Sequence, residues 1–394
     1  MKPNHKRTNR ESCFLGLCFS LTAFLIIFSL RPPSLAQTKP DWRQRWEKVL
    51  SEAKKESKVV VWGPPGELIR RAMTEGFKKA FPDISIEYSG ARGGEQATRI
   101  KAERDGSVYS VDVLLSGTTT ANTYMKPMKA LDPIEPALIL PEVTDLKNWR
   151  GNTLEFSDET TRFNLVFVNM LKTPLVYNPQ LAKPEEIDEL SKLLDPKWKG
   201  RFVLNDPLPS GSGNVTFRWI WRNMGPERAK DYYRKIRANA AVVDRDQRRQ
   251  IEWVAQGKYA FLLAPSDGTL GQLLERGLKV GILPEFKDYG TYVTASFGSA
   301  MFINKAPHPS AATVFLNWVL TKEGQTYWSK AMDHVSKRVD VPTDHLPPYV
   351  IPPPDAKFFT GVPMPGYRYW LSHSEANVHR SPEEDKILKE LFGR

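Results

Sequence analysis

The sequence predicts an α/β protein with two separate sheets, and three observations support this class. In the first half, short apolar strands at 58–63, 84–90 and 111–117 alternate with helical patterns at 67–80 and 95–104. Such alternation is typical of βαβ units and a largely parallel sheet. The alternation restarts near the middle of the chain, which predicts a second sheet of similar size. Finally, each strand of the first half runs directly into small or polar residues.

The second half contains enough periodic segments for that second sheet. After its last strand, helical patterns follow, and a high density of proline from Pro342 to Pro365 predicts an extended tail with little regular structure. No sequence repeat and no low-complexity linker separates the halves. The expected strands cover 162–169, 173–178, 200–207, 240–246, 259–268, 280–286 and 298–305, and the expected helices cover 226–238, 247–258, 309–321 and 323–332.

The loops after the first three strands are candidate ligand contacts. In open α/β sheets, ligands bind outside the carboxyl ends of the strands, so these loops belong on one edge. Their small residues let an anion approach the free N–H groups of a helix start, and Arg92 adds a forked cation. The candidates here are Gly63, Pro64, Ser89, Arg92, Gly93, Ser116, Gly117 and Thr118.

The segment "NDPLPSGSGNVTFRWIW", residues 205–221, repeats this pattern in the second half. A helix start carries roughly half a positive charge and unpaired N–H groups, which suits a carboxylate or phosphate. Ordinary helix capping by Ser, Asn and Gly is the alternative explanation. The candidates in this half are Tyr177, Ser210, Gly211, Ser212, Gly213, Asn214, Asp244, Ser266 and Asp267.

Motifs of catalysis and metal binding are weak. Ser210 stands where a nucleophile elbow around Ser212 requires glycine, and no histidine is near in sequence. The chain has neither a phosphate-binding Gly-x-x-x-x-Gly-Lys loop nor a strand-linked Gly-x-Gly-x-x-Gly. The spacing of His373, Glu375 and His379 fits no helical metal pair, so we interpret them as surface residues. We therefore expect no catalytic residue, no metal and no cofactor.

The first 36 residues have the pattern of a secretory signal peptide. A basic start precedes the apolar run 13–30, and Ser34 to Ala36 offer small residues for cleavage before Gln37. An uncleaved membrane anchor is the alternative, because the apolar run approaches spanning length. Leu17 before Cys18 argues against a lipoprotein. We expect a protein free in the periplasm, without thiol chemistry, because Cys13 and Cys18 both lie in the peptide.

The charge of the chain does not indicate a nucleic-acid binder. The peptide carries five basic residues and one acidic residue, so the remainder keeps +7 of the formal +11. These charges are of both signs and dispersed, whereas nucleic-acid binders concentrate basic residues on one face or tail. The densest basic stretch, Arg245 to Gln250, lies in a helical pattern and is interpreted as a solvated face.

Several segments together resemble the extracellular solute-binding proteins of ABC importers, of the branch that handles ferric iron, thiamine, polyamines and phosphonates. The resemblance spans about 52–325 and is carried by six segments. They are "EAKKESKVVVWG", "FKKAFPDISIEYSGARGGE", "ERDGSVYSVDVLLSG", "LLDPKWKGRFVLNDP", "WVAQGKYAFLLA" and "INKAPHPSAATVFLNWVLTKEGQ".

This resemblance implies the two-lobed type II periplasmic-binding-protein fold. Each lobe would be a mixed, mostly parallel sheet flanked by helices, and crossing strands near "PLVYN" and "SFGSAMFI" would form a hinge. The expected boundaries are a signal peptide at 1–36, lobe 1 at 37–170, lobe 2 at 171–296, and a return to lobe 1 with a Pro-rich tail at 297–394. The implied partners are a small-molecule solute and an inner-membrane ABC permease with its ATPase, and we expect a monomer.

For the ligand, we expect a small anionic organic solute. Ferric-iron members carry a Tyr-Tyr pair where this chain has Pro265 and Ser266, and Tyr232-Tyr233 lies in a helix where packing explains it. A ferric-iron, thiamine or polyamine ligand stays an alternative, as does a secreted serine hydrolase. Asp267 is the main sign of a cation, because Arg245 can neutralise Asp244 and we expect Asp112 to point into the fold.

Overall fold

The computed structural model of the chain describes residues 41–158, 160–209 and 211–393. The predicted signal peptide, its cleavage site and Ser210 lie outside the described residues. Across those three ranges, no helix combines the length and the apolar character needed to cross a bilayer.

The first sheet gathers strands from the first part of the described chain and one strand, β14, from much later in the sequence. Its order is β2-β1-β3-β14-β6-β5, and β4 also pairs with β14. β1 is parallel to β2 and β3, whereas β14 is antiparallel to β3, β4 and β6, and β5 is antiparallel to β6. We call this sheet with its helices lobe 1. The strands are β1 (Lys58–Gly63), β2 (Ser85–Gly90), β3 (Val113–Ser116), β4 (Leu131–Asp132), β5 (Glu155–Phe156), β6 (Asn164–Val166) and β14 (Ser299–Ile303).

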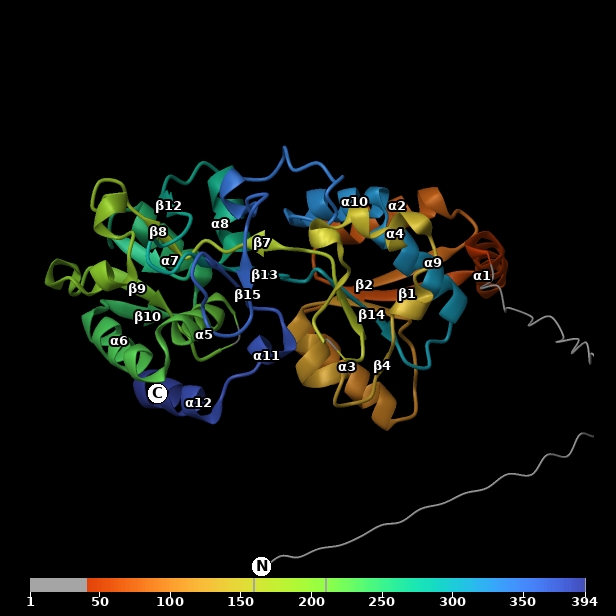
Figure 1. Cartoon of the computed structure of the whole chain (residues 1–394), viewed down its shortest axis with the longest axis horizontal. Coiled ribbons are helices and arrows are strands. Elements are labelled where there is room, and N and C mark those ends of the chain that lie inside the picture. Colours follow the sequence, from red (N-terminus) through yellow and green to blue (C-terminus); the bar gives the residue numbers. More distant parts are fainter. Residues whose placement is uncertain (1–40, 159, 210, 394) are drawn as a thin grey trace, which may run out of the picture. The chain divides into compact units, whose positions relative to one another are not determined.

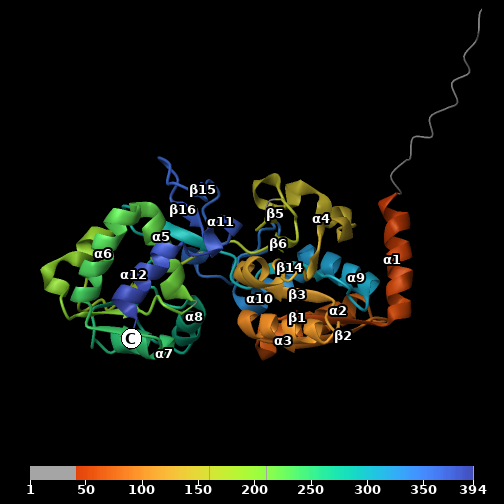
Figure 2. The same ribbon diagram turned by 90° about the horizontal axis from the view of Figure 1, so that it is seen from below.

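Helices of lobe 1 bury apolar residues against the sheet or a neighbouring helix, and α9 is buried on all sides. In α2, Ile69, Met73 and Phe77 recur at helical spacing and are at most 1% exposed. α2 contacts α10 and α1 contacts α9, as Figure 2 shows for α1 and α9. The helices are α1 (Trp42–Glu56), α2 (Glu67–Ala80), α3 (Gly93–Asp105), the π-helix η1 (Thr120–Met125), α4 (Pro141–Thr144), α9 (Pro309–Leu320) and α10 (Lys322–Met332).

The second sheet has the order β10-β9-β11-β8-β12 and, with its helices, forms lobe 2. β9 is parallel to β10 and β11, whereas β8 is antiparallel to both β11 and β12. Its elements are β8 (Leu175–Tyr177), β9 (Phe202–Asn205), α5 (Ser212–Met224), α6 (Pro226–Asn239), β10 (Val242–Asp244), α7 (Gln247–Ala255), β11 (Phe261–Leu263), α8 (Asp267–Glu275) and β12 (Gly281–Leu283).

Aromatic side chains dominate the core of lobe 2. Tyr232 and Tyr233 on α6 are each 4% exposed, and Tyr233 packs 4.4 Å from Phe217 between ring centroids. Burial raises the pKa of both phenols well above the ordinary value. The packing role predicted for this tyrosine pair is confirmed.

A third sheet, of order β15-β16-β13-β7, carries the chain between the two lobes. β7 (Met170–Leu171) leads into lobe 2, and β13 (Thr291–Thr294), antiparallel to it, leads back to lobe 1. The crossing strands β7 and β13 therefore come directly before "PLVYN" and "SFGSAMFI", the two segments predicted to form the hinge. "PLVYN" itself belongs to the sheet of lobe 2 and "SAMFI" to that of lobe 1.

The C-terminal residues contribute to the connecting sheet and contact both lobes. β15 (Phe358–Phe359) and β16 (Tyr369–Leu371) extend the connecting sheet, because β16 is parallel to β13. The short helix α11 (Glu375–Val378) contacts η1 in lobe 1, and α12 (Pro382–Phe392) packs on α6 in lobe 2. The expectation that all of 297–394 belongs with lobe 1 is thus corrected, because Ile387, Leu388 and Phe392 join the core of lobe 2.

Candidate ligand-binding site

The strands of lobe 1 bring one group of predicted residues to a single edge. β1, β2 and β3 are parallel, so their carboxyl ends at Gly63, Gly90 and Ser116 lie together. β14 runs the other way, which places its first residue, Ser299, beside Ser116. The Ser299 hydroxyl donates a hydrogen bond of 2.7 Å to the Ser116 carbonyl and fixes this corner of the edge.

The start of α3 lies against this corner, and Gly93 makes the approach possible. A Cβ atom on Gly93 would lie 2.1 Å from Thr120 Oγ1 and 3.2 Å from Ser116 Oγ. Both hydroxyl side chains are buried, and Ser116 Oγ has no hydrogen-bond partner among the described residues. A helix start with a buried unpaired hydroxyl beside it is suited to an anion, since N–H and O–H donors converge there.

Gly117 and Thr118 extend the same corner toward the strands that join the lobes. A Cβ atom on Gly117 would lie 3.0 Å from the carbonyl oxygen of Ser296, which follows β13. Thr118 is 5% exposed and leads into the π-helix η1, a kind of helix that occurs frequently at functional sites. Arg92 is the exposed N-cap residue of α3, and its side chain makes no capping hydrogen bond.

The loop after β1 is occupied by protein atoms. The Gly63 carbonyl accepts a hydrogen bond of 2.7 Å from Gln96 Nε2, and the Pro64 carbonyl accepts one of 2.9 Å from the Tyr88 hydroxyl. A Cβ atom on Gly63 would lie 2.2 Å from that hydroxyl. Ser89 is exposed beside this contact. Gly63 and Pro64 therefore have a structural explanation that needs no ligand.

In lobe 2, the start of α5 meets the carboxyl ends of three parallel strands. Gly211 has a φ of 143°, a left-handed conformation that favours glycine. A Cβ atom on Gly213 would lie 2.5 Å from the Asp206 carbonyl oxygen, so this glycine permits close packing. Asn214 Nδ2 donates a 2.8 Å hydrogen bond to the Pro207 carbonyl. Half-buried Ser212, by contrast, begins the helix without a capping contact.

The acidic residues at this edge are neutralised by the protein itself. The Asp244 carboxylate accepts hydrogen bonds from the backbone N–H groups of Arg245 and Asp246 and from both Arg249 nitrogens, Nε at 2.9 Å and Nη2 at 2.7 Å. Although burial would raise the pKa of Asp244, these bonds hold it below the usual value. Arg245 pairs instead with Asp206 at 2.6 Å, which corrects the predicted pairing of Arg245 with Asp244.

Asp267, the strongest sign of a cationic ligand, is also paired. Its carboxylate contacts the ammonium group of Lys172 and accepts a 3.3 Å hydrogen bond from the Thr173 N–H. The Lys172 side chain is 5% exposed, and burial lowers its pKa while Asp267 opposes that shift. Ser266, the residue before Asp267, accepts a hydrogen bond of 3.3 Å from the Thr269 hydroxyl.

Asp112 points into the fold as predicted, whereas Tyr177 does not lie where a ligand contact was predicted. The buried Asp112 carboxylate accepts hydrogen bonds from the N–H groups of Val60 and His308, so it points into the fold. Tyr177 pairs with Phe261 at the start of β11, the end opposite to Leu263 and Asn205. Because β8 is antiparallel to β11, Tyr177 lies away from the candidate edge, and we leave it outside the site.

A buried ionic cluster at the lobe 1 edge was missed in the sequence. The Glu155 carboxylate contacts Lys337 Nζ and His373 Nε2, two side chains that are each 3% exposed. Burial, with a smaller effect of Lys337, lowers the pKa of His373 to about 3. His373 is thus buried, which corrects its interpretation as a surface residue. Nothing in the local sequence around Lys337, which lies between Ser336 and Arg338, indicated its burial.

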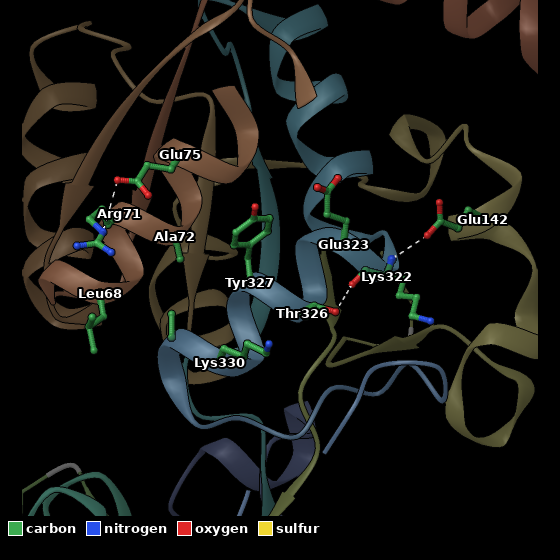
Figure 3. Close-up of a pocket in the computed structure, with 11 residues that line it drawn as sticks. Leu68, Arg71, Ala72, Glu75, Glu142, Lys322, Glu323, Thr326, Tyr327 and Lys330 are labelled. Atoms are coloured by element: carbon green, nitrogen blue, oxygen red, sulfur yellow. Dashed lines mark hydrogen bonds and ion pairs between the residues drawn. The ribbon is translucent and has the colours of Figure 1, made fainter. Parts of the chain in front are cut away.

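A hollow on lobe 1 lies elsewhere. It has a volume of about 770 Å³ and is lined by α2, α4 and α10, as Figure 3 shows. Arg71 pairs with Glu75 at 3.4 Å along α2, and the Lys322 N–H donates to Glu142 at 2.8 Å. No predicted ligand residue lines it, and nothing in the structure indicates what would cover it.

Two lobes joined by crossing strands, each with a helix start at its strand ends, define a class of solute-binding proteins. A family model described as bacterial extracellular solute-binding protein matches residues 72–345. The chain therefore belongs to this family, and the predicted resemblance and fold class are confirmed.

Solved structures share the fold at low sequence identity. Mannheimia haemolytica ferric iron-binding protein A in an open conformation matches with a TM-score of 0.64 at 13% identity, over 86% of this chain and 99% of its own. The Trichodesmium protein IdiA (FutA), in complex with iron and citrate, matches with a TM-score of 0.60 at 18% identity, over 85% and 97%. AfuA from Actinobacillus pleuropneumoniae, with fructose-6-phosphate bound, matches with a TM-score of 0.59 at 14% identity, over 84% and 97%.

One curated relative aligns over part of the chain. Iron uptake protein A1 of Synechocystis is 25% identical over 163 residues, which cover 39% of this chain. The alignment spans only 44% of that relative's own length.

Proposed function

We propose that the protein is the periplasmic solute-binding component of an ABC importer, which captures a small anionic organic solute between its lobes and delivers it to the membrane permease. The protein itself would perform no chemistry. The observation that carries the ligand class is the corner formed by Gly93, Ser116 and Thr120, where a helix start and an unpaired buried hydroxyl converge. Arg92 would add charge at its rim.

A cationic ligand is disfavoured because the carboxylates of lobe 2 are paired with basic side chains of the protein. A cationic ligand such as thiamine or a polyamine needs carboxylates that are free to meet it. Asp206, Asp244 and Asp267 instead pair with Arg245, Arg249 and Lys172. Arg245 and Arg249 are half exposed, whereas Lys172 is buried, so freeing Asp267 would leave an uncompensated buried charge, which is costly.

A ferric ligand is the second candidate, because the printed names of several relatives include iron. The tyrosine pair at Tyr232 cannot supply oxygen ligands, since both phenols are buried in the core of lobe 2 with raised pKa values. Iron carried as a citrate complex would still present an anionic organic surface. Ferric citrate therefore belongs among the solutes to be tested.

The serine hydrolase alternative has little support in the geometry. A nucleophilic Ser212 needs a histidine base within hydrogen-bonding distance. The four buried or half-buried histidines of the described chain have other partners. His308 bonds to Asp112, His334 to Trp328, His345 to Ser329 and His373 to Glu155.

A thermal-shift screen of the exported protein tests the proposal. The panel contains sugar phosphates, phosphonates, carboxylates and ferric citrate, with thiamine and spermidine as cationic controls. A ligand at 100 times its dissociation constant stabilises a protein by roughly 2.7 kcal/mol. We expect stabilisation by an anionic organic solute. Stabilisation by thiamine or spermidine alone would contradict the ligand class, and ester hydrolysis abolished by Ser212→Ala would contradict the binding function.

A further inference from the structure

Residues 372–380, which we call the C-terminal strap, lie beyond the part of the chain that the family model matches. That match ends at residue 345. The strap begins where β16 leaves the connecting sheet, contains α11, and ends just before α12. It contacts both lobes.

On the lobe 2 side the strap is anchored by buried groups. The guanidinium of Arg218, on α5, donates a hydrogen bond to the Asn377 carbonyl, and the two residues are 4% and 2% exposed. Arg380 donates a 3.1 Å hydrogen bond to the carbonyl of Leu208, in the loop before α5. Directly after the strap, α12 buries its apolar face against lobe 2.

On the lobe 1 side, at the end far from the connecting sheet, the strap makes a partly exposed ion pair and a backbone hydrogen bond to the buried residue Ser157. Glu375 pairs with Lys126 at 2.6 Å, and the two side chains are 39% and 26% exposed. The Glu375 N–H donates a 2.8 Å hydrogen bond to the Ser157 carbonyl. Lys126 follows η1, the helix reached directly from the candidate residues Ser116 to Thr118.

We propose that the C-terminal strap is a latch between the lobes: it moves with lobe 2 and releases lobe 1 when the Glu375–Lys126 pair opens. We expect it to move with lobe 2 because its contacts with lobe 2 are buried, whereas its ion pair with lobe 1 is partly exposed. Breaking the lobe 2 side would expose a buried arginine and apolar residues of α12, whereas a partly exposed ion pair costs little to break. His373, buried against Glu155 beside the connecting sheet, would stay near the pivot.

The latch can be measured as a distance between the lobes without any solute, so the result does not depend on the proposed ligand class. Cys13 and Cys18 are the chain's two cysteines, and both are changed to Ser. Spin labels are then attached at Lys78→Cys on α2 and Ala238→Cys on α6, both exposed positions. Double electron–electron resonance gives the distribution of distances between them.

We expect Glu375→Gln to raise the ratio of longer to shorter interlobe distances by up to about fivefold, the range of a partly exposed ion pair. Glu375→Lys should raise it further through repulsion of Lys126, and Lys126→Glu combined with Glu375→Lys should restore the parent distribution. Glu383→Gln is the matched control, because it removes an ion pair of the same C-terminal region with Lys230, within lobe 2. It should leave the distances unchanged.

Two outcomes would overturn the latch. One is a distance distribution that is the same in the parent, Glu375→Gln and Glu375→Lys, with melting temperatures showing that all three are folded. The other is an equal shift in Glu383→Gln, which would mean that loss of any charge in the C-terminal region acts on the lobes.

Discussion

A Cβ atom on Gly93 would lie 2.1 Å from Thr120 Oγ1, so a larger residue at the start of α3 requires the Thr120 side chain to move. This contact joins the loops that follow β2 and β3, the strands on either side of β1, into one corner. It explains the glycine at position 93 but not the adjacent Gly94. Around Gly94, the next residue, nothing lies within 4 Å of an added Cβ atom.

Gly93→Ala is expected to destabilise the protein by about 1–3 kcal/mol, the usual cost of overpacking a tight contact, and to abolish solute binding. Urea unfolding and calorimetric titration measure the two effects. Adding Thr120→Ala should relieve the overlap and recover stability. Gly94→Ala is the control and should be neutral or slightly stabilising, because alanine favours a helix. Equal effects of the two glycine substitutions would contradict the close packing.

Ser116→Ala and Ser299→Ala should separate binding from stability. Ser116 Oγ has no partner among the described residues, so its removal should leave the free energy of unfolding nearly unchanged and weaken anion binding about tenfold or more. Ser299 Oγ bonds to the Ser116 carbonyl, so Ser299→Ala should cost about 1 kcal/mol of stability. If Ser116→Ala binds as tightly as the parent, its hydroxyl does not contact the solute.

Asp267→Asn is expected to destabilise the protein by about 3–5 kcal/mol, because it leaves the buried ammonium group of Lys172 without a counter-charge. The double variant Lys172→Met/Asp267→Asn should recover most of this loss. Chemical denaturation of the four proteins forms a double-mutant cycle. Additive effects of the two substitutions would mean that the pair is not coupled.

Stability should fall in mild acid because of His334. Burial lowers the pKa of this side chain to about 4, and its Nδ1 accepts a 3.1 Å hydrogen bond from Trp328. Between pH 6.5 and 4 the unfolded chain therefore binds a proton that the folded chain does not, which removes up to about 3 kcal/mol of stability as the pH falls. Unfolding of His334→Gln should depend less on pH in this window. The exposed His379→Gln serves as control and should keep the parental slope.

The sequence was sufficient for the features that depend on local pattern. Strand and helix periodicity located both sheets, and the position of Tyr232 and Tyr233 within a helical pattern predicted their packing. The segment 291–294 was missed because β13 is held mainly by partners far away in the chain, at Met170 and Leu171 and at Tyr369 to Leu371.

The wrong predictions at the candidate site concern the direction of a strand and ion pairs between residues that are far apart in the sequence. The pattern around Tyr177 indicates a strand but not that it runs antiparallel to β11, and this direction decides which end faces the site. Lys172 pairs with Asp267 across 95 residues, and His373 pairs with Glu155 across 218. No local pattern contains such pairings, so the neutralisation of Asp267 could not be recognised from sequence, whereas that of Asp244 by a nearby arginine could.

The central claim, that the anionic group of the solute is held at the start of α3, is tested most directly by backbone amide chemical shifts. The isotope-labelled protein would be titrated with the solute that gives the largest thermal shift. The account predicts saturable shifts of the amides of Gly93 to Glu95 and of Gly117 and Thr118, absent in Gly93→Ala. Shifts confined to other residues, such as those lining the hollow between α2 and α10, would contradict it.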